Sequence, residues 1–330
     1  MKTIPYRLNA TLDWVEDFAI AMGATIEGQL VNIATDEMKG VCYFSQIDPQ
    51  VSSMIMDIKY DQTVSFTLRN NDASFLGLYF NITDIELDFL IDGNPQSSGK
   101  WKYRFSIFDG SLDSDFAIKE NSSVYTLCIF IKKNFLINYL DKMTAFKPGI
   151  KDFFDPQKNT ITRIDRISEE SLSRILELRR IPYDAPFYDY IYKSTVYALI
   201  GDCIDQFSQG NAPVVSKMSS EDVYRINITM ELLLQSLHDD FPGIEPLAKI
   251  AFMSPTKYKM LFKKITGLSV KSFFIKNKIE LAKNLLETED TDVNELSSRL
   301  NYQSVSYFIK RFKEYYGMTP KEFVKQLHSV

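Results

Sequence analysis

Histidine and cysteine are scarce in this sequence. Its 330 residues include two histidines and three cysteines, and Cys42, Cys128 and Cys203 are far apart, so no CxxC pair occurs. This scarcity excludes a multi-histidine metal site, a zinc ribbon, a thiol redox motif and a local Cys–His catalytic pair. We expect three free, buried thiols in a reducing cytosol, and neither a metal nor another cofactor.

Long apolar runs without charge are also missing. No stretch approaches the roughly 18 residues of a transmembrane helix, and the N-terminus lacks the basic start and apolar middle of a signal peptide. We therefore expect a cytoplasmic protein with no membrane partner. The 24 Phe and 18 Tyr residues suffice for a large core and exclude long disorder. The length predicts about two domains, or three.

Charge is distributed unevenly along the chain. Residues 1–215 carry 21 basic and 29 acidic residues, whereas residues 216–330 carry 17 basic and 14 acidic ones. The basic residues of the second part cluster in 254–266 and 304–313, and acidic residues collect in 287–295. Two basic helices separated by an acidic connector indicate two docking surfaces. On charge alone, two solvated helix faces would give the same pattern.

The first 130 residues read mostly as short strands separated by turns, which predicts a β-sandwich or a small barrel with a pocket. Helical periodicity follows at 167–181 and 187–209. The second of these segments is so apolar that we expect it to be buried against the barrel, a partner subunit, or both, and to mediate dimerisation through 187–208. Six aromatic residues are candidates for lining the pocket, although plain core is their commoner fate: Trp14, Tyr43, Tyr60, Tyr79, Phe80 and Trp101.

The expected fold class is α+β. A β-rich domain over 1–135 precedes a helical linker and dimerisation segment over 136–215, and an all-α domain over 216–330 follows. Capping residues support the helices of the last part. Ser254 and Thr319 each precede a proline, and Gly267 and Gly317 follow helix ends where a positive φ is needed. Helices are predicted at 220–238, 245–251, 255–266, 270–287, 292–299, 305–316 and 320–327.

Two segments of the all-α domain, 246–267 and 295–317, share one design. Each has a short helix, a tight turn, a second helix with a serine cap, a Phe-Lys pair and a closing glycine. Such a unit is a helix-turn-helix, whose second helix fits the major groove of DNA. The predicted core stripes are Tyr258, Leu261, Phe262 and Ile265 in the first unit and Phe308, Phe312 and Tyr315 in the second.

This tandem arrangement resembles the DNA-binding domain of the AraC/XylS family of bacterial transcription regulators. The segment NYQSVSYFIKRFKEYYGMTPKEF is similar to the family signature, and the resemblance covers about 245–327. It implies two units joined rigidly by the helix 270–287, with double-stranded DNA as the partner. By position, the expected base contacts are Thr256, Lys259 and Met260 in the first unit and Val305, Ser306 and Lys310 in the second. The expected phosphate contacts are Lys257, Lys263, Lys264, Arg311 and Lys313.

The sequence departs from the family pattern at Phe252 and Asn301, where each turn usually has glycine. Asparagine tolerates a left-handed conformation, but phenylalanine does so poorly, so we expect the first turn to be rearranged. Met260 stands where a polar base contact is frequent. The first unit is therefore expected to contact thymine methyl groups or to contribute little.

The resemblance also implies a cupin-like N-terminal barrel that senses a small-molecule effector or mediates dimerisation. A weaker similarity to the siderophore-responsive (PchR-like) branch favours an iron chelate, with sugars, fatty acids or a partner protein as alternatives. The expected function is a homodimeric, sequence-specific regulator, an activator with RNA polymerase as a further partner, and no enzyme. Two alternatives are an enzyme that uses Asp84/Glu86 or Asp113/Asp115, and an adaptor whose helices bind protein.

Overall fold

The structure, a computed structural model, describes residues 2–70, 72–83, 86–91, 94–100, 104–142, 149–208, 214–289 and 291–327, with the backbone alone described in 86–91, 94–100 and 206–208. The chain divides into two compact units, Met1–Tyr224 (unit 1) and Arg225–Val330 (unit 2). None of the helices in these described ranges has the length and apolar character needed to cross a membrane.

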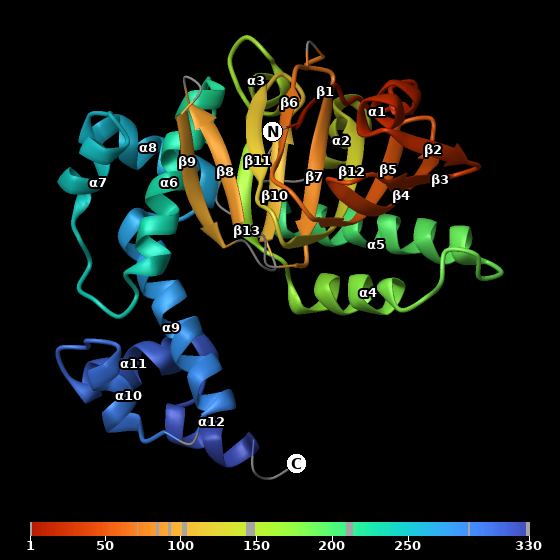
Figure 1. The fold of residues 1–330 in the computed structure, drawn as a ribbon. Coiled ribbons are helices and arrows are strands. Elements are labelled where there is room, and N and C mark those ends of the chain that lie inside the picture. The colour runs from red at the N-terminus through yellow and green to blue at the C-terminus, as the bar shows by residue number, and fades with distance from the viewer. Residues whose placement is uncertain are drawn as a thin grey trace. The chain divides into compact units, whose positions relative to one another are not determined.

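Unit 1 is built on two β-sheets, shown in Figure 1. The larger has the strand order β13-β10-β7-β12-β5-β4-β3-β2, and the smaller has the order β1-β6-β11-β8-β9. In the smaller sheet β1 and β6 run parallel, with Lys2 opposite Val64. The strands are β1 (Lys2–Tyr6), β2 (Ala24–Glu27), β3 (Leu30–Ala34), β4 (Met38–Asp48), β5 (Val51–Tyr60), β6 (Val64–Leu68), β7 (Phe75–Asn81), β8 (Glu86–Ile91), β9 (Asn94–Lys100), β10 (Arg104–Asp109), β11 (Ser114–Ile118), β12 (Ser122–Lys132) and β13 (Thr162–Arg166).

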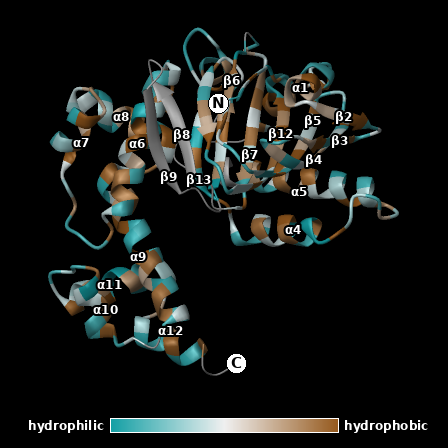
Figure 2. Ribbon diagram, viewed as in Figure 1, coloured by the Kyte–Doolittle hydropathy of each residue, from teal (hydrophilic) through white to brown (hydrophobic). Residues whose placement is uncertain are grey.

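The larger sheet is covered on both faces. One face packs against α4 (Glu169–Arg179) and α5 (Tyr188–Ser208), with α2 (Lys133–Leu140) and α3 (Ile150–Phe154) at one end. The other face packs with α1 (Val15–Met22) and the inner face of the smaller sheet. Because both faces are covered, β12 is buried over nearly its whole length, which explains its continuous apolar sequence. Figure 2 shows this hydrophobic centre in brown.

The six aromatic residues proposed to line one pocket do not share a site. Tyr43 and Phe80 belong to the core beneath α4 and α5, whereas Trp14, Tyr60 and the partly buried Tyr79 belong to the core on the opposite face of the sheet. Trp101 lies outside the described residues. Alternation along the strands sends neighbouring aromatics to opposite faces, and five of these residues are core.

Unit 2 contains only helices among the residues that the structure describes. The division between the units falls inside α6 (Ser220–Gln235). The helices that follow are α7 (Ile244–Ile250), α8 (Pro255–Thr266), α9 (Val270–Thr288), α10 (Val293–Arg299), α11 (Val305–Tyr316) and α12 (Pro320–Leu327). The predicted class, a β-rich N-terminal part followed by an all-α C-terminal domain, is confirmed. The segment 136–215, expected to be helical, also contributes β13 to the edge of the larger sheet.

Candidate DNA interface

The first helix-turn-helix consists of α7 and α8. The amide of Phe252 donates to the carbonyl of Lys249 at 3.1 Å, and the amide of Met253 donates to that of Ala248 at 2.9 Å. Ser254 then caps α8 by accepting a hydrogen bond from the amide of Lys257. Phe252 has a φ of 53°, in the left-handed region. The turn therefore forms at the position where glycine is usual, with a phenylalanine in the strained conformation.

The second helix-turn-helix, α10 and α11, closes with the same hydrogen bonds. Asn301 donates to Ser298 at 2.9 Å and Tyr302 donates to Ser297 at 3.0 Å, and Asn301 has a φ of 49°. Since the two turns match, the expectation that Phe252 rearranges the first turn is wrong. The second turn has one more residue than the first between its left-handed residue and the cap, Ser304. Each residue of α8 therefore corresponds to the residue of α11 that is 50 positions later in the sequence.

The outward face of α8 carries most of the residues predicted for it. Thr256, Lys257, Lys259, Met260 and Lys263 are all exposed. Lys264, predicted to contact phosphate, is instead only 8% exposed and lies on the inner side of the helix. Its neighbours Leu261, Phe262 and Ile265 form the core, and the Tyr258 hydroxyl donates to Thr229 Oγ1 of α6 at 3.1 Å. Three exposed lysines and no acidic residue make the outward face of this helix basic.

Ser306, Lys310 and Lys313 are exposed on α11, and Val305 is half-buried at its N-terminus. Arg311 is half-buried. Its Nε donates to the Tyr307 hydroxyl at 3.0 Å, and its guanidinium pairs with Glu314 at 2.7 Å. These two contacts hold the predicted phosphate ligand against its own helix.

The inner stripe of α11 differs from the prediction by one residue. Phe308 and Phe312 are fully buried as expected, but Tyr315 is 42% exposed. Tyr316 packs instead, with its ring 4.9 Å from Phe312 and 6.5 Å from Phe323 of α12. The helical period puts position i+4 rather than i+3 over this part of the core. The contact of Tyr307 with Arg311 was not predicted. The spacing of four residues between them was the available signal.

Of the two carboxylate pairs considered as an alternative enzyme site, the pair Asp113/Asp115 is occupied by structural contacts. Asp113 accepts from the amide of Asn70 at 3.0 Å, and Asp115 forms a two-pronged ion pair with Arg69. Asp84 and the side chain of Glu86 lie outside the described residues. The described pair therefore braces a loop.

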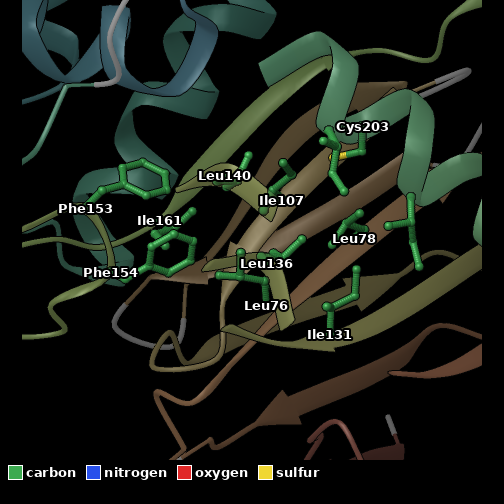
Figure 3. A pocket seen from close by; sticks show the side chains of 12 residues that line it. Leu76, Leu78, Ile107, Ile131, Leu136, Leu140, Phe153, Phe154, Ile161 and Cys203 are labelled. Carbon is green, nitrogen blue, oxygen red and sulfur yellow. The ribbon is translucent and has the colours of Figure 1, made fainter. Parts of the chain in front are cut away.

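An apolar cavity lies in unit 1 between the larger sheet and the helices α2, α3 and α5 (Figure 3). The space left free is about 10 Å³, roughly the room of one water molecule and far below the several hundred Å³ of a ligand pocket. This cavity is therefore close-packed core. Its lining consists of Leu76, Leu78, Ile107, Ile131, Leu136, Leu140, Phe153, Phe154, Ile161, Ile200, Cys203 and Ile204.

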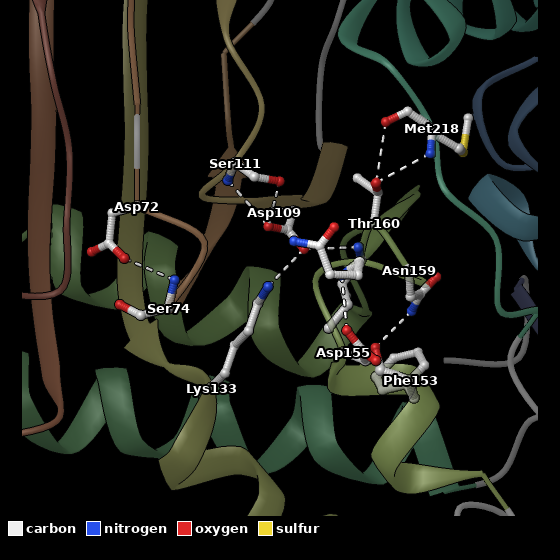
Figure 4. A network of polar contacts seen from close by, with 12 residues as sticks. Asp72, Ser74, Asp109, Ser111, Lys133, Phe153, Asp155, Asn159, Thr160 and Met218 are labelled. Atoms are coloured by element: carbon white, nitrogen blue, oxygen red, sulfur yellow. Dashed lines mark hydrogen bonds and ion pairs between the residues drawn. The ribbon is translucent and has the colours of Figure 1, made fainter.

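A buried polar network borders this region (Figure 4). Asp109 pairs with Lys133 at 2.8 Å and accepts from the amide of Ile161 at 3.0 Å. The next residue back, Thr160, exchanges hydrogen bonds of 3.1 Å with the backbone of Met218. The network thus fixes the segment that leads into α6.

Residues 247–326 match a family model described as a helix-turn-helix domain. An uncharacterised helix-turn-helix transcriptional regulator of Haemophilus influenzae is 31% identical over 103 residues, which cover 31% of this chain and 34% of the relative. The transcriptional activator FapR of Escherichia coli is 23% identical over 227 residues, 62% of this chain and 86% of the relative. The chain spans between a fifth and about half of the length of the first three relatives.

Two solved structures are also similar. The DNA-binding domain of AdpA, in complex with a target DNA, is 26% identical and covers 32% of this chain and 94% of that one, with a TM-score of 0.30. ToxT of Vibrio cholerae with a bound unsaturated fatty acid is 12% identical, covers 86% of this chain and 98% of that one, and has a TM-score of 0.32.

The geometry of α7–α8 and α10–α11 defines a tandem helix-turn-helix DNA-binding domain. The sequence matches agree, because the family model covers this part of the chain and the relatives are helix-turn-helix transcription regulators.

Proposed function

We propose that this chain is a sequence-specific transcription regulator whose helices α8 and α11 enter successive major grooves on one side of DNA. The observation that carries the proposal is the equivalence of the two turns, caps and closing glycines, which presents two exposed helix faces from one compact unit. Thr256, Lys259 and Met260 are assigned to bases from α8, and Val305, Ser306 and Lys310 from α11.

The phosphate contacts are assigned to Lys257, Lys263 and Lys313, which are exposed beside the base-contacting residues. Arg311 joins them when DNA phosphate competes with Glu314 for its guanidinium. Lys264 is left out because it is buried. These contacts fix the register of the protein on DNA, whereas the base contacts carry the sequence preference.

The test is selection of bound sequences from a randomised duplex library by the full-length protein. The expected pool contains two short conserved blocks about one helical turn apart. Lys310→Ala is expected to remove the preference in one block only, and Met260→Ala to alter the other. A folded protein that enriches no sequence contradicts the proposal.

We further propose that DNA binding is controlled by a small-molecule effector and by dimerisation of the chain. A small molecule bound to unit 1 favours one arrangement of the linker or dimer and so alters contacts with DNA and RNA polymerase. Exposed aromatic side chains on α5 and at the residue before it support dimerisation: Phe187 is 73% exposed, Tyr190 74% and Tyr197 46%.

Tyr190→Asp is expected to convert a dimer to a monomer in light scattering. Ile20→Asp, which places the same charge on a comparably exposed residue of α1 (77% exposed, against 74% for Tyr190), is the matched control and is expected to leave the dimer intact. A wild-type chain that is monomeric at micromolar concentration contradicts this part of the proposal.

A further inference from the structure

Lys278, in the middle of α9, is buried. Only 5% of it is exposed, and it forms no ion pair with a carboxylate of any residue that the structure describes. Lysine is rarely buried without a compensating charge. Burial lowers the pKa of Lys278, against the opposing effect of Asp240 and Asp239 nearby. Since an apolar side chain would fill this place without desolvating a charge, stability alone does not explain the lysine.

The Lys278 ammonium instead joins three segments of unit 2. It donates a hydrogen bond of 2.7 Å to the carbonyl of Asp239, in the loop between α6 and α7. It lies 5.1 Å from the ring centre of Phe274, one turn earlier on α9, and 5.3 Å from that of Tyr302. Cations are attracted to ring faces at these distances.

Tyr302 connects this ammonium to the second DNA-contacting helix. It follows Asn301 in the turn between α10 and α11, and its ring lies 5.0 Å from that of Phe308 in α11. The same loop makes a second contact, because His238 Nδ1 lies 3.3 Å from the carbonyl of Arg299 at the end of α10. The segment that introduces the first helix-turn-helix is therefore fastened to the turn of the second.

We propose that Lys278 is a positioning residue that fixes the separation and rotation of α11 relative to α8, and thereby the spacing of the two DNA blocks that the protein accepts. This inference rests on the proposed function for its DNA readout. The hydrogen bond and the two cation–π contacts come from different segments and are directional. They therefore hold one arrangement of α8 and α11, whereas purely apolar packing would allow several.

The experiment uses the full-length protein and a set of duplexes that carry both selected blocks with the wild-type spacing or with one or two base pairs added or removed. Wild-type protein is expected to prefer one spacing. Lys278→Met keeps the apolar stem but removes the charge and the donor, and is expected to reduce this preference ~3- to 10-fold while base preferences inside each block persist. Lys278→Arg, which keeps the charge, is expected to restore it.

The matched control is Lys276→Met, which removes a lysine from the same helix at a position that pairs with Glu280. It is expected to retain the wild-type spacing preference. If Lys278→Met keeps the preference, or loses base preference inside a block as well, the proposal is overturned. Should that variant fail to fold, as judged by circular dichroism, His238→Ala removes the exposed contact to Arg299 and is expected to weaken the spacing preference in the same direction.

A second readout does not depend on DNA. Spin labels are attached to the double variant Lys263→Cys/Lys313→Cys, on the exposed faces of α8 and α11. Double electron–electron resonance then measures the distance between the two helices. One narrow distribution is expected with Lys278 and a broad one with Lys278→Met. A broad distribution in the otherwise wild-type chain overturns the inference, whereas a narrow one without any DNA enrichment overturns only the proposed function.

Discussion

The guanidinium of Arg225 lies 4.4 Å from the centre of the Phe252 ring. Phe252 is 81% exposed and holds the left-handed conformation of the first turn, where its φ is 53°. A non-glycine residue there has an energetic cost of about 1–2 kcal/mol. The cation–π contact offsets part of that cost, about 0.5–1 kcal/mol at an exposed site.

Replacing Phe252 separates these two effects. Phe252→Gly and Phe252→Ala both remove the ring, but only glycine relieves the backbone strain. We expect the glycine variant to be more stable than the alanine variant by about 1 kcal/mol in urea denaturation. Asn301→Gly and Asn301→Ala, at the equivalent turn, should differ in the same sense. Equal stabilities within each pair would show that the positive φ is not strained.

Lys263 and Lys313 occupy equivalent exposed positions on α8 and α11. Replacing either with alanine should reduce the slope of log affinity against log salt concentration by about 1, and equally on specific and scrambled duplexes. Fluorescence anisotropy at several salt concentrations measures this slope. Lys264→Ala, at the buried neighbouring position, should leave the slope unchanged. A lower slope in that variant would place Lys264 on DNA despite its burial.

Asp109 and Lys133 form an ion pair whose side chains are 1% and 7% exposed. Asp109→Ala should cost about 3–5 kcal/mol in urea denaturation, because it leaves a buried ammonium without a partner. The double variant with Lys133→Met should recover much of this loss. If the double variant is as unstable as the sum of the single ones, the two charges act independently.

Asp57, half-buried on β5, has a pKa raised by burial, although Arg179 acts in the opposite direction. A raised carboxyl pKa means that the folded state favours the protonated form. The contribution to stability is present at acid pH and is lost as pH rises through the folded-state pKa. Asp57→Asn should therefore increase stability at pH 7, and the gain should shrink as pH falls below the folded-state pKa and vanish below the unfolded-state pKa.

Asp61 provides the opposite case for the same titration. Its pKa is lowered by hydrogen bonds from Lys39 and Lys59, so its contribution is present at neutral pH and is lost as pH falls. Asp61→Asn should decrease stability at pH 7. Denaturation at several pH values checks both residues, and shifts of the same sign would contradict the assigned causes.

Local chemistry made the DNA-binding domain predictable. Serine caps, Pro255 and the closing glycines act within one turn of the helix, so α8 and α11 appear within a residue of the predicted bounds. The positions that failed depend on tertiary packing. Tyr315 and Tyr316 are equally apolar, and the position of α12 decides which of them packs against the core. Lys264 carries the same charge as Lys263, and its place on the inner side follows from the phase of the helix against the core.

In unit 1 the sequence predicted strands but not their neighbours. β13 pairs with β10 across more than 50 residues, and no local pattern in TRIDR indicates that contact. The division of Trp14 and Tyr43 between two cores likewise depends on which face of the sheet each strand turns toward a partner. Pairing at long range is the information that composition and periodicity lack.

Equivalent positions of α8 and α11, which are 50 residues apart, carry different side chains. At equivalent places on the two helices, Met260 corresponds to Lys310 and Lys259 to Ile309. One scaffold thus presents a thioether where its duplicate presents an ammonium, and the two blocks of a site cannot be exchanged. With the proposed base contacts, a single chain is expected to recognise an oriented sequence, and inverting that sequence at a promoter should abolish recognition.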